Sequence, residues 1–200
     1  MRKIILIGGA PTAGKSYAAK QIADSLKMPW ISTDDIREQM RKTSKKEDFK
    51  NLFFHSDPSL NAVKYLLKYS ADEIVENQND ESADVWKGVK DFIEKNSAGG
   101  LIVEGVAVLP SLVKKLKVKN KEIKVVFLMD DNIKRVRKTI FTRGLWDDAD
   151  KYPDDVKEKE VEWVMAFNKY IEDEAKKYGF NVIKVGNRKD YIEKIKELIK

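Results

Sequence analysis

Short apolar runs alternate with amphipathic segments along the whole chain. Runs rich in β-branched residues predict five buried strands, at Lys3–Gly8, Trp30–Ser32, Leu101–Val103, Ile123–Met129 and Asn181–Val185. Apolar residues spaced three and four positions apart predict helices at Lys15–Lys27, Asp34–Lys42, Leu60–Glu76, Ala83–Lys95, Asn132–Arg143, Asp154–Tyr178 and Tyr191–Ile199. Residues 43–58 follow neither period, and we expect a loop there.

This order of strands and helices predicts an α/β fold. Strands that alternate with helices form a parallel sheet with helices on both faces. A chain of 200 residues is long enough for one domain of this kind, 1–200. Ligands of such folds bind beyond the carboxyl ends of the strands, so the residues that follow each strand are the candidates for chemistry.

The most specific motif follows the first predicted strand and reads Gly9-Ala-Pro-Thr-Ala-Gly14-Lys15-Ser16. It matches the phosphate-binding loop, in which backbone N–H groups at a helix N-terminus surround an anion. We expect Lys15 to bridge the β- and γ-phosphates of ATP and the Ser16 hydroxyl to bind Mg²⁺. The nucleotide-binding residues predicted from this motif are Gly9, Ala10, Pro11, Thr12, Ala13, Gly14, Lys15, Ser16 and Tyr17.

A second motif, Ser32-Thr33-Asp34-Asp35-Ile36-Arg37, follows the second predicted strand. We interpret Asp34 as a general base for an attacking hydroxyl, with Asp35 as the reserve and a candidate substrate contact. Arg37, one helical turn on, can bind an anionic substrate through its two-pronged guanidinium. The alternative is purely structural: Thr33 or Asp34 caps the helix, and Arg37 is a solvated partner.

Two more acids end predicted strands. Glu104 is placed to hold Mg²⁺ through water or to bind substrate, and its structural alternative is a cap for the next turn. For Asp130 we favour a capping role, at the helix that begins at Asn132, over a role in magnesium binding.

A basic stretch follows the fourth predicted strand. Arginines there can cover a transferring phosphoryl group and neutralise its charge, while a mobile lid excludes water. We predict a catalytic role for Arg143 and substrate contacts for Arg135 and Arg137, although spacing alone does not choose among them. The alternative is an exposed basic helix. We expect the segment of about 132–153 to be mobile without ligand, because it carries little apolar surface beyond Leu145 and Trp146.

Composition narrows the class further. The chain has no cysteine, which excludes disulfides and thiol chemistry and suits a cytoplasmic protein. No apolar run approaches the roughly 20 residues that cross a bilayer, so we expect no membrane role. The net charge of +6 attracts phosphorylated ligands and allows a nucleic-acid partner, which we do not favour because the lysines are spread evenly. His55, the only histidine, cannot form a metal cluster.

Three segments taken together resemble the 2-phosphoglycerate kinase family and, more loosely, zeta-toxin-like and nucleoside monophosphate kinases. They are Ile5-Leu-Ile-Gly-Gly-Ala-Pro-Thr-Ala-Gly-Lys-Ser16, Ile31-Ser-Thr-Asp-Asp-Ile-Arg-Glu-Gln-Met-Arg41 and Ile102-Val-Glu-Gly105. The order of motifs matches from residue 4 to about 185. One departure is Thr-Ala before Gly14, where these families often place a glycine.

The resemblance implies a P-loop NTPase three-layer sandwich with strand order 2-3-1-4-5. It implies a helical substrate lobe at 43–97 and a lid at about 132–153. The implied reaction is ATP-dependent phosphorylation of a small, anionic hydroxyl compound with Mg²⁺. By motif position Asp34 matches the family's base, Arg37 its substrate arginine and Arg143 its lid arginine.

Two other functions remain open on the sequence: a polynucleotide or nucleotide kinase, and a non-catalytic nucleotide-binding regulator. A GTP switch is disfavoured. Such proteins read guanine with Asn-Lys-x-Asp, whereas Asn187-Arg188-Lys189-Asp190 has its lysine displaced. The pattern points to no particular oligomeric state.

Overall fold

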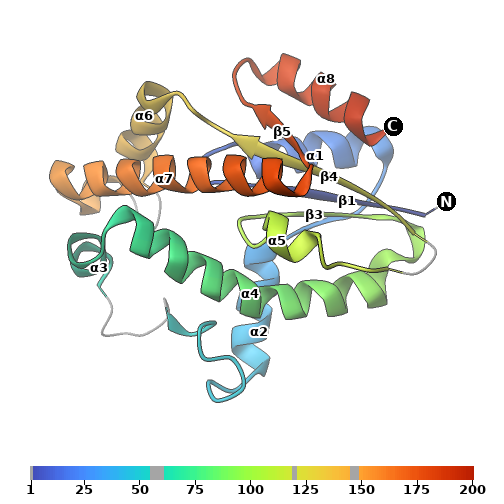
Figure 1. The fold of residues 1–200 in the computed structure, drawn as a ribbon, viewed down its shortest axis with the longest axis horizontal. Helices are drawn as coiled ribbons and strands as arrows, with labels where there is room; N and C mark the ends of the chain where they lie inside the picture. The colour runs from blue at the N-terminus through green and yellow to red at the C-terminus, as the bar shows by residue number, and fades with distance from the viewer. Residues whose placement is uncertain (1, 55–60, 119–120, 145–148) are drawn as a thin grey trace.

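The computed structural model of the chain describes residues 2–54, 61–118, 121–144 and 149–200. Its centre is a five-stranded parallel sheet with the order β2-β3-β1-β4-β5 (Figure 1), which confirms the predicted α/β fold and strand order. The strands are β1 (Arg2–Gly9), β2 (Trp30–Ser32), β3 (Leu101–Glu104), β4 (Lys121–Met129) and β5 (Asn181–Lys184). His55 and residues 145–148 of the predicted lid lie outside the described residues.

Helices cover both faces of this sheet. They are α1 (Lys15–Leu26), α2 (Thr33–Thr43), α3 (Ala62–Lys68), α4 (Ala71–Asn96), α5 (Pro110–Val113), α6 (Ile133–Arg143), α7 (Asp154–Tyr178) and α8 (Arg188–Ile199), with short 3-10 turns at Ser97–Gly99 and Ala149–Lys151. Helices α1 and α8 lie on one face, and α4 and α7 run side by side on the other (Figure 1). Among the described helices, none is long and apolar enough to cross a membrane.

The core has two parts because the central strand is buried on both sides. Ile4 and Leu6 of β1 pack toward α4 and α7, while Ile5 and Ile7 pack toward α1 and α8. All four side chains are fully buried. Alternation of this kind follows from the two-residue period of a strand, and it explains the continuous apolar run in the sequence.

The helical lobe differs from the sequence prediction at one boundary. We predicted a break between helices at residues 77–82, but α4 runs without interruption from Ala71 to Asn96. The break instead precedes Ser70, whose hydroxyl accepts from the Glu73 N–H at 3.3 Å. The Glu73 carboxylate accepts in return from the Ser70 N–H at 2.8 Å, and this reciprocal pair starts the helix.

The polar residues that suggested a break are buried inside the lobe. Gln78, Glu81 and Ser82 are each less than a tenth exposed. Ser82 Oγ donates to the Gln78 carbonyl at 2.6 Å, and Glu81 forms a 2.7 Å ion pair with Arg41 of α2. The polar run therefore faces partners on α2 and on its own helix, and it does not interrupt α4.

Candidate active site

The predicted motifs lie together at the carboxyl ends of β2, β3 and β1, which are neighbours in the sheet. In the strand register Glu104 lies beside both Ile7 of β1 and Ser32 of β2. The phosphate-binding loop continues from β1 and α2 begins directly after β2. The loop, Glu104 and the start of α2 therefore share one edge of the sheet, as parallel strands require.

The loop has the backbone shape of an anion site. Thr12 and Gly14 both adopt left-handed conformations, with φ of 64° and 76°. Gly14 precedes α1 without a side-chain cap, so the first N–H groups of this helix are not satisfied by a capping side chain. At Gly9, with φ of 141°, a Cβ would lie 2.1 Å from the Leu128 carbonyl oxygen. These features fit the phosphates of a nucleotide.

Lys15 lies within this loop and is buried. Its Nζ donates to the Ala10 carbonyl at 2.7 Å. Burial lowers the pKa of Lys15 below its ordinary value, although the charges of Glu104 and Asp34 act to raise it. Arg143 adds to the lowering. An anion bound in the loop would favour the charged form of this ammonium group.

Ser16 and Glu104 form a pair of oxygen ligands. The Ser16 hydroxyl donates to Glu104 Oε1 at 2.9 Å, and Glu104 is 2% exposed. Burial raises the pKa of Glu104, while Lys15 and Ser16 oppose the shift. A hydroxyl and a carboxylate suit Mg²⁺. The described residues contain no group of three histidine, cysteine or acidic side chains that could hold a metal ion. In proteins Mg²⁺ commonly binds through one or two carboxylates and keeps several waters.

The turn after Glu104 is set by a glycine. Gly105 has φ of 147°, and a Cβ on it would lie 1.8 Å from Thr33 Oγ1 at the start of α2. Thr33 is buried, and its hydroxyl has no hydrogen-bond partner among the described residues. This close approach fixes the start of α2 against the end of β3, and so fixes Asp34 relative to Glu104.

We expect Gly105→Ala to destabilise the protein by at least about 2 kcal/mol, from overpacking and a disfavoured φ together. Chemical denaturation followed by circular dichroism measures this. Gly99→Ala is the matched control, because a Cβ there meets nothing within 4 Å. Equal stability of the two variants would contradict the packing described at Gly105.

Helix α2 places Asp34 at the site. The predicted cap, Thr33 or Asp34, is wrong: the Ser32 hydroxyl caps α2 by accepting from the Asp34 N–H at 3.1 Å. The Asp34 carboxylate is therefore available to form a 3.1 Å ion pair with Arg37. The Asp34 charge acts to raise the pKa of both Lys15 and Glu104, as expected for groups at the same edge of the sheet. Asp35 is exposed at the same helix start.

Asp130 acts mainly as a structural acid. It is 3% exposed, and its Oδ1 accepts from the Asn132 N–H at 3.0 Å. It also accepts two 2.6 Å hydrogen bonds from Arg135, which donates a third to the Val185 carbonyl at 2.6 Å. The prediction that Asp130 caps α6 is wrong: the capping side chain is that of Asn132, which accepts from the Arg135 N–H at 3.1 Å. Arg135 is thus tied to the ends of β4 and β5.

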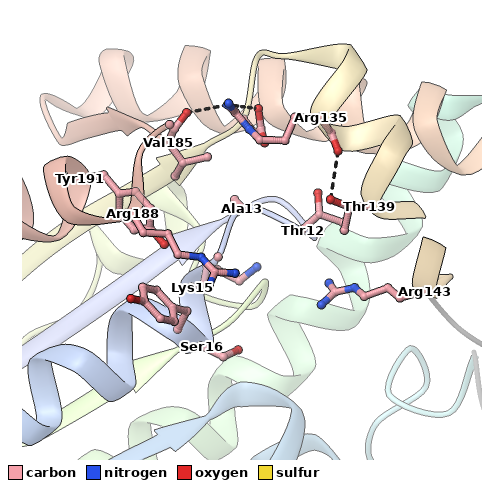
Figure 2. A pocket seen from close by; sticks show the side chains of 14 residues that line it. Thr12, Ala13, Lys15, Ser16, Arg135, Thr139, Arg143, Val185, Arg188 and Tyr191 are labelled. Carbon is pink, nitrogen blue, oxygen red and sulfur yellow. Dashed lines mark hydrogen bonds and ion pairs between the residues drawn. The ribbon is translucent and has the colours of Figure 1, made fainter. Parts of the chain in front are cut away.

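The other two predicted arginines of α6 point in different directions. Arg137 donates to Glu158 of α7 at 2.8 Å and does not belong to the described lining of the cavity beside the loop. Arg143 does line that cavity, and Figure 2 shows its guanidinium directed toward the loop from the end of α6.

This cavity has a volume of about 320 Å³ and opens beside the phosphate-binding loop (Figure 2). Its lining joins the loop to α6, to the end of β5 and to the start of α8. The residues concerned are Thr12, Ala13, Gly14, Lys15, Ser16, Tyr17, Asp130, Arg135, Thr139, Arg143, Val185, Gly186, Arg188 and Tyr191.

Sequence reasoning missed the part of the cavity that lies beyond β5. The Arg188 guanidinium lies 4.6 Å from the Tyr17 ring centroid, and the Tyr17 and Tyr191 rings meet edge to face at 6.5 Å. The sequence did contain a signal for this part of the cavity, because Arg188 closely follows the end of a predicted strand. We considered that segment only as a guanine-reading motif.

Comparison with known proteins identifies solved structures that share this fold. No protein-family model matches the chain, and a search of curated proteins found no match. A gluconokinase from Sinorhizobium meliloti 1021 has a similar structure, with a TM-score of 0.57 at 14% identity over 99% of this chain and 90% of that chain. A shikimate kinase from Acinetobacter baumannii, in complex with shikimate, gives 0.54 at 15% over 100% and 93%. TT1252 from Thermus thermophilus gives 0.54 at 16% over 97% and 94%.

At these identities the likeness shows a shared fold, the α/β P-loop kinase-like fold. The resemblance of the motifs to 2-phosphoglycerate kinases stays a prediction.

Proposed function

We propose that this chain is an ATP-dependent kinase that transfers the γ-phosphoryl group to a hydroxyl of a small, anionic metabolite. The observation that carries the proposal is the meeting of three motifs at one sheet edge. Buried Lys15 lies in a loop shaped for phosphates, Ser16 contacts Glu104, and Asp34 with Arg37 lies on the neighbouring element.

The nucleotide would bind with its phosphates at the loop and its remainder in the adjoining cavity. Lys15 would neutralise the phosphate oxygens, and Ser16 with Glu104 would hold Mg²⁺. Bound Mg²⁺ would neutralise charge on the phosphates during transfer. The aromatic pair Tyr17 and Tyr191, with Arg188, offers stacking surface for a base.

The acceptor would react from the side of α2. Its hydroxyl oxygen forms a bond to the γ-phosphorus while the bond from that phosphorus to the β–γ bridging oxygen breaks, and ADP leaves. The hydroxyl proton passes to the Asp34 carboxylate and then to water. Arg37 would bind an anionic group elsewhere on the acceptor. An acceptor like 2-phosphoglycerate carries both a hydroxyl that can react and an anionic group that Arg37 can bind.

ATP turnover with and without a pool of hydroxyl acceptors tests this function. We expect ADP release to rise at least about tenfold with an acceptor from the pool, because a positioned hydroxyl competes well with water. Tight ATP binding with no acceptor-dependent turnover would instead identify a nucleotide-binding regulator. Stimulation by oligonucleotide ends alone would identify a polynucleotide kinase.

We expect Arg143→Ala to lower kcat about 100-fold and to weaken ATP binding much less. The guanidinium lines the cavity near Lys15, and the charge that it meets would develop during transfer. Kinetics and calorimetric ATP titration separate the two effects. Lys138→Ala, which removes a cation from the exposed face of α6, is the control and should change neither. A fully active Arg143→Ala variant would make this arginine part of a solvated surface.

A further inference from the structure

Arg37 is shared among three carboxylates. Its guanidinium lies 3.1 Å from Asp34, 3.3 Å from Glu38 and 3.9 Å from Glu81. Burial acts to lower the pKa of Arg37, but Asp34, Glu81 and Glu38 outweigh it and raise that pKa. Arg37 is therefore held as a cation on α2, the side of the site from which the acceptor is proposed to react.

One of the three carboxylates is fixed. The Glu81 side chain is 2% exposed, and its Oε1 forms a 2.7 Å ion pair with Arg41. Arg41 also donates to the Leu52 carbonyl at 2.9 Å, which ties α2 to the loop before α3. A buried carboxylate that loses its partners is strongly destabilising, so Glu81 cannot easily leave this position.

Asp34 and Glu38 are both more than half exposed, but Glu38 is also held by Arg41 at 2.8 Å, so Asp34 is the most replaceable member of the cluster. Its side chain is 58% exposed, against 2% for Glu81. An exposed ion pair is weak, since solvent and salt screen it. An incoming anion can therefore take the place of Asp34 on Arg37, while Glu81 continues to hold the guanidinium from the buried side.

We propose that the Asp34–Arg37 ion pair is a resting contact, which the anionic group of the acceptor displaces, and that Glu81 is the positioning residue that keeps Arg37 in place during this exchange. One event then binds the acceptor and releases the Asp34 carboxylate toward the acceptor's hydroxyl. This inference rests on the proposed function and deepens it: the acceptor class is a compound that carries a carboxylate or phosphate together with the reacting hydroxyl.

A small free anion should reproduce the first half of this event. Formate can occupy Arg37 while water acts as the phosphoryl acceptor. At constant ionic strength we expect formate to stimulate ATP hydrolysis about two- to fivefold and saturably, the change that release of a weak exposed ion pair permits. Arg37→Met should hydrolyse ATP without any response to formate, because its Asp34 has no partner to lose.

The role of Glu81 is tested with a matched pair of variants on α4. Glu81→Gln should require much higher formate concentrations for the same stimulation, while its affinity for ATP stays unchanged. Asp84→Asn is the control. Asp84 is also a buried carboxylate, one turn further on, but it binds the Asn51 N–H at 3.0 Å and Lys87 at 2.8 Å. The Asp84→Asn variant should respond to formate as the wild type does.

A readout independent of turnover separates this inference from the proposed function. Formate titration should shift the Arg37 Nε–H resonance in the NMR spectrum of the wild type and of Asp84→Asn. If formate leaves the Arg37 resonance unmoved, the inference is overturned regardless of the rate of ATP turnover. Stimulation by formate that persists in Arg37→Met also overturns it. Absence of ATP turnover under all conditions, together with a formate-dependent shift of Arg37, would overturn the kinase function and leave the anion exchange standing.

Discussion

Replacement of Lys15 by alanine should lower phosphoryl transfer by at least about 1,000-fold, near the upper range for one electrostatic contact in a transition state. Lys15 is the buried cation of the phosphate-binding loop, held at 2.7 Å from the Ala10 carbonyl. Its removal leaves the transferring group without the ammonium charge that the loop positions. The measurement is ADP release under single-turnover conditions at saturating ATP.

Lys20→Ala controls for the loss of a cation from the same helix, because Lys20 lies on the exposed face of α1. That variant should keep wild-type turnover. If Lys15→Ala also turned over ATP at a near-normal rate, the loop would not be the site of transfer.

The second large effect is expected at Asp34. Asp34→Asn keeps the size of the side chain but cannot take the hydroxyl proton, so kcat should fall at least about 100-fold, the scale of a lost general base. ATP affinity should stay nearly unchanged, because Asp34 lies on α2 and is not among the described residues that line the cavity beside the loop. Single-turnover kinetics and calorimetric ATP titration measure the two quantities.

Asp35→Asn decides between the two neighbouring acids. Asp35 is exposed at the same helix start, and we expect a small effect on kcat. A larger defect in Asp35→Asn than in Asp34→Asn would reverse the assignment. An equal loss of ATP affinity and turnover in Asp34→Asn would point to a role in folding or metal binding.

The strands and the glycine-rich turn between β1 and α1 could be predicted because their signals are local. Ile4 to Ile7 form a short β-branched apolar run, typical of a strand covered on both faces, and the glycines of the loop follow at once. The fold then brings Glu104 beside this loop through strand register, a long-range relation that follows from the parallel order.

The missed features depend on partners distant in sequence. Polarity suggested a break near Glu81, whereas an arginine on α2 stabilises that carboxylate inside the lobe. The pairing of Arg37 with Glu81 could not be predicted for the same reason. Arg188 and Tyr191 reach the cavity beside the loop only because β5 lies at the sheet edge beside β4. Local patterns report burial and period, and they do not report which side chains meet.

Direct transfer of label tests the kinase account most closely. The protein is incubated with Mg²⁺ and ATP labelled in the γ-phosphoryl group, together with hydroxy acids and phosphate esters that carry a hydroxyl, and the products are separated. The account predicts label covalently bound to an anionic hydroxyl compound, dependent on Lys15 and Asp34. Label that appears only as inorganic phosphate at the same rate with and without every acceptor, or transfer that Lys15→Ala retains, would contradict it.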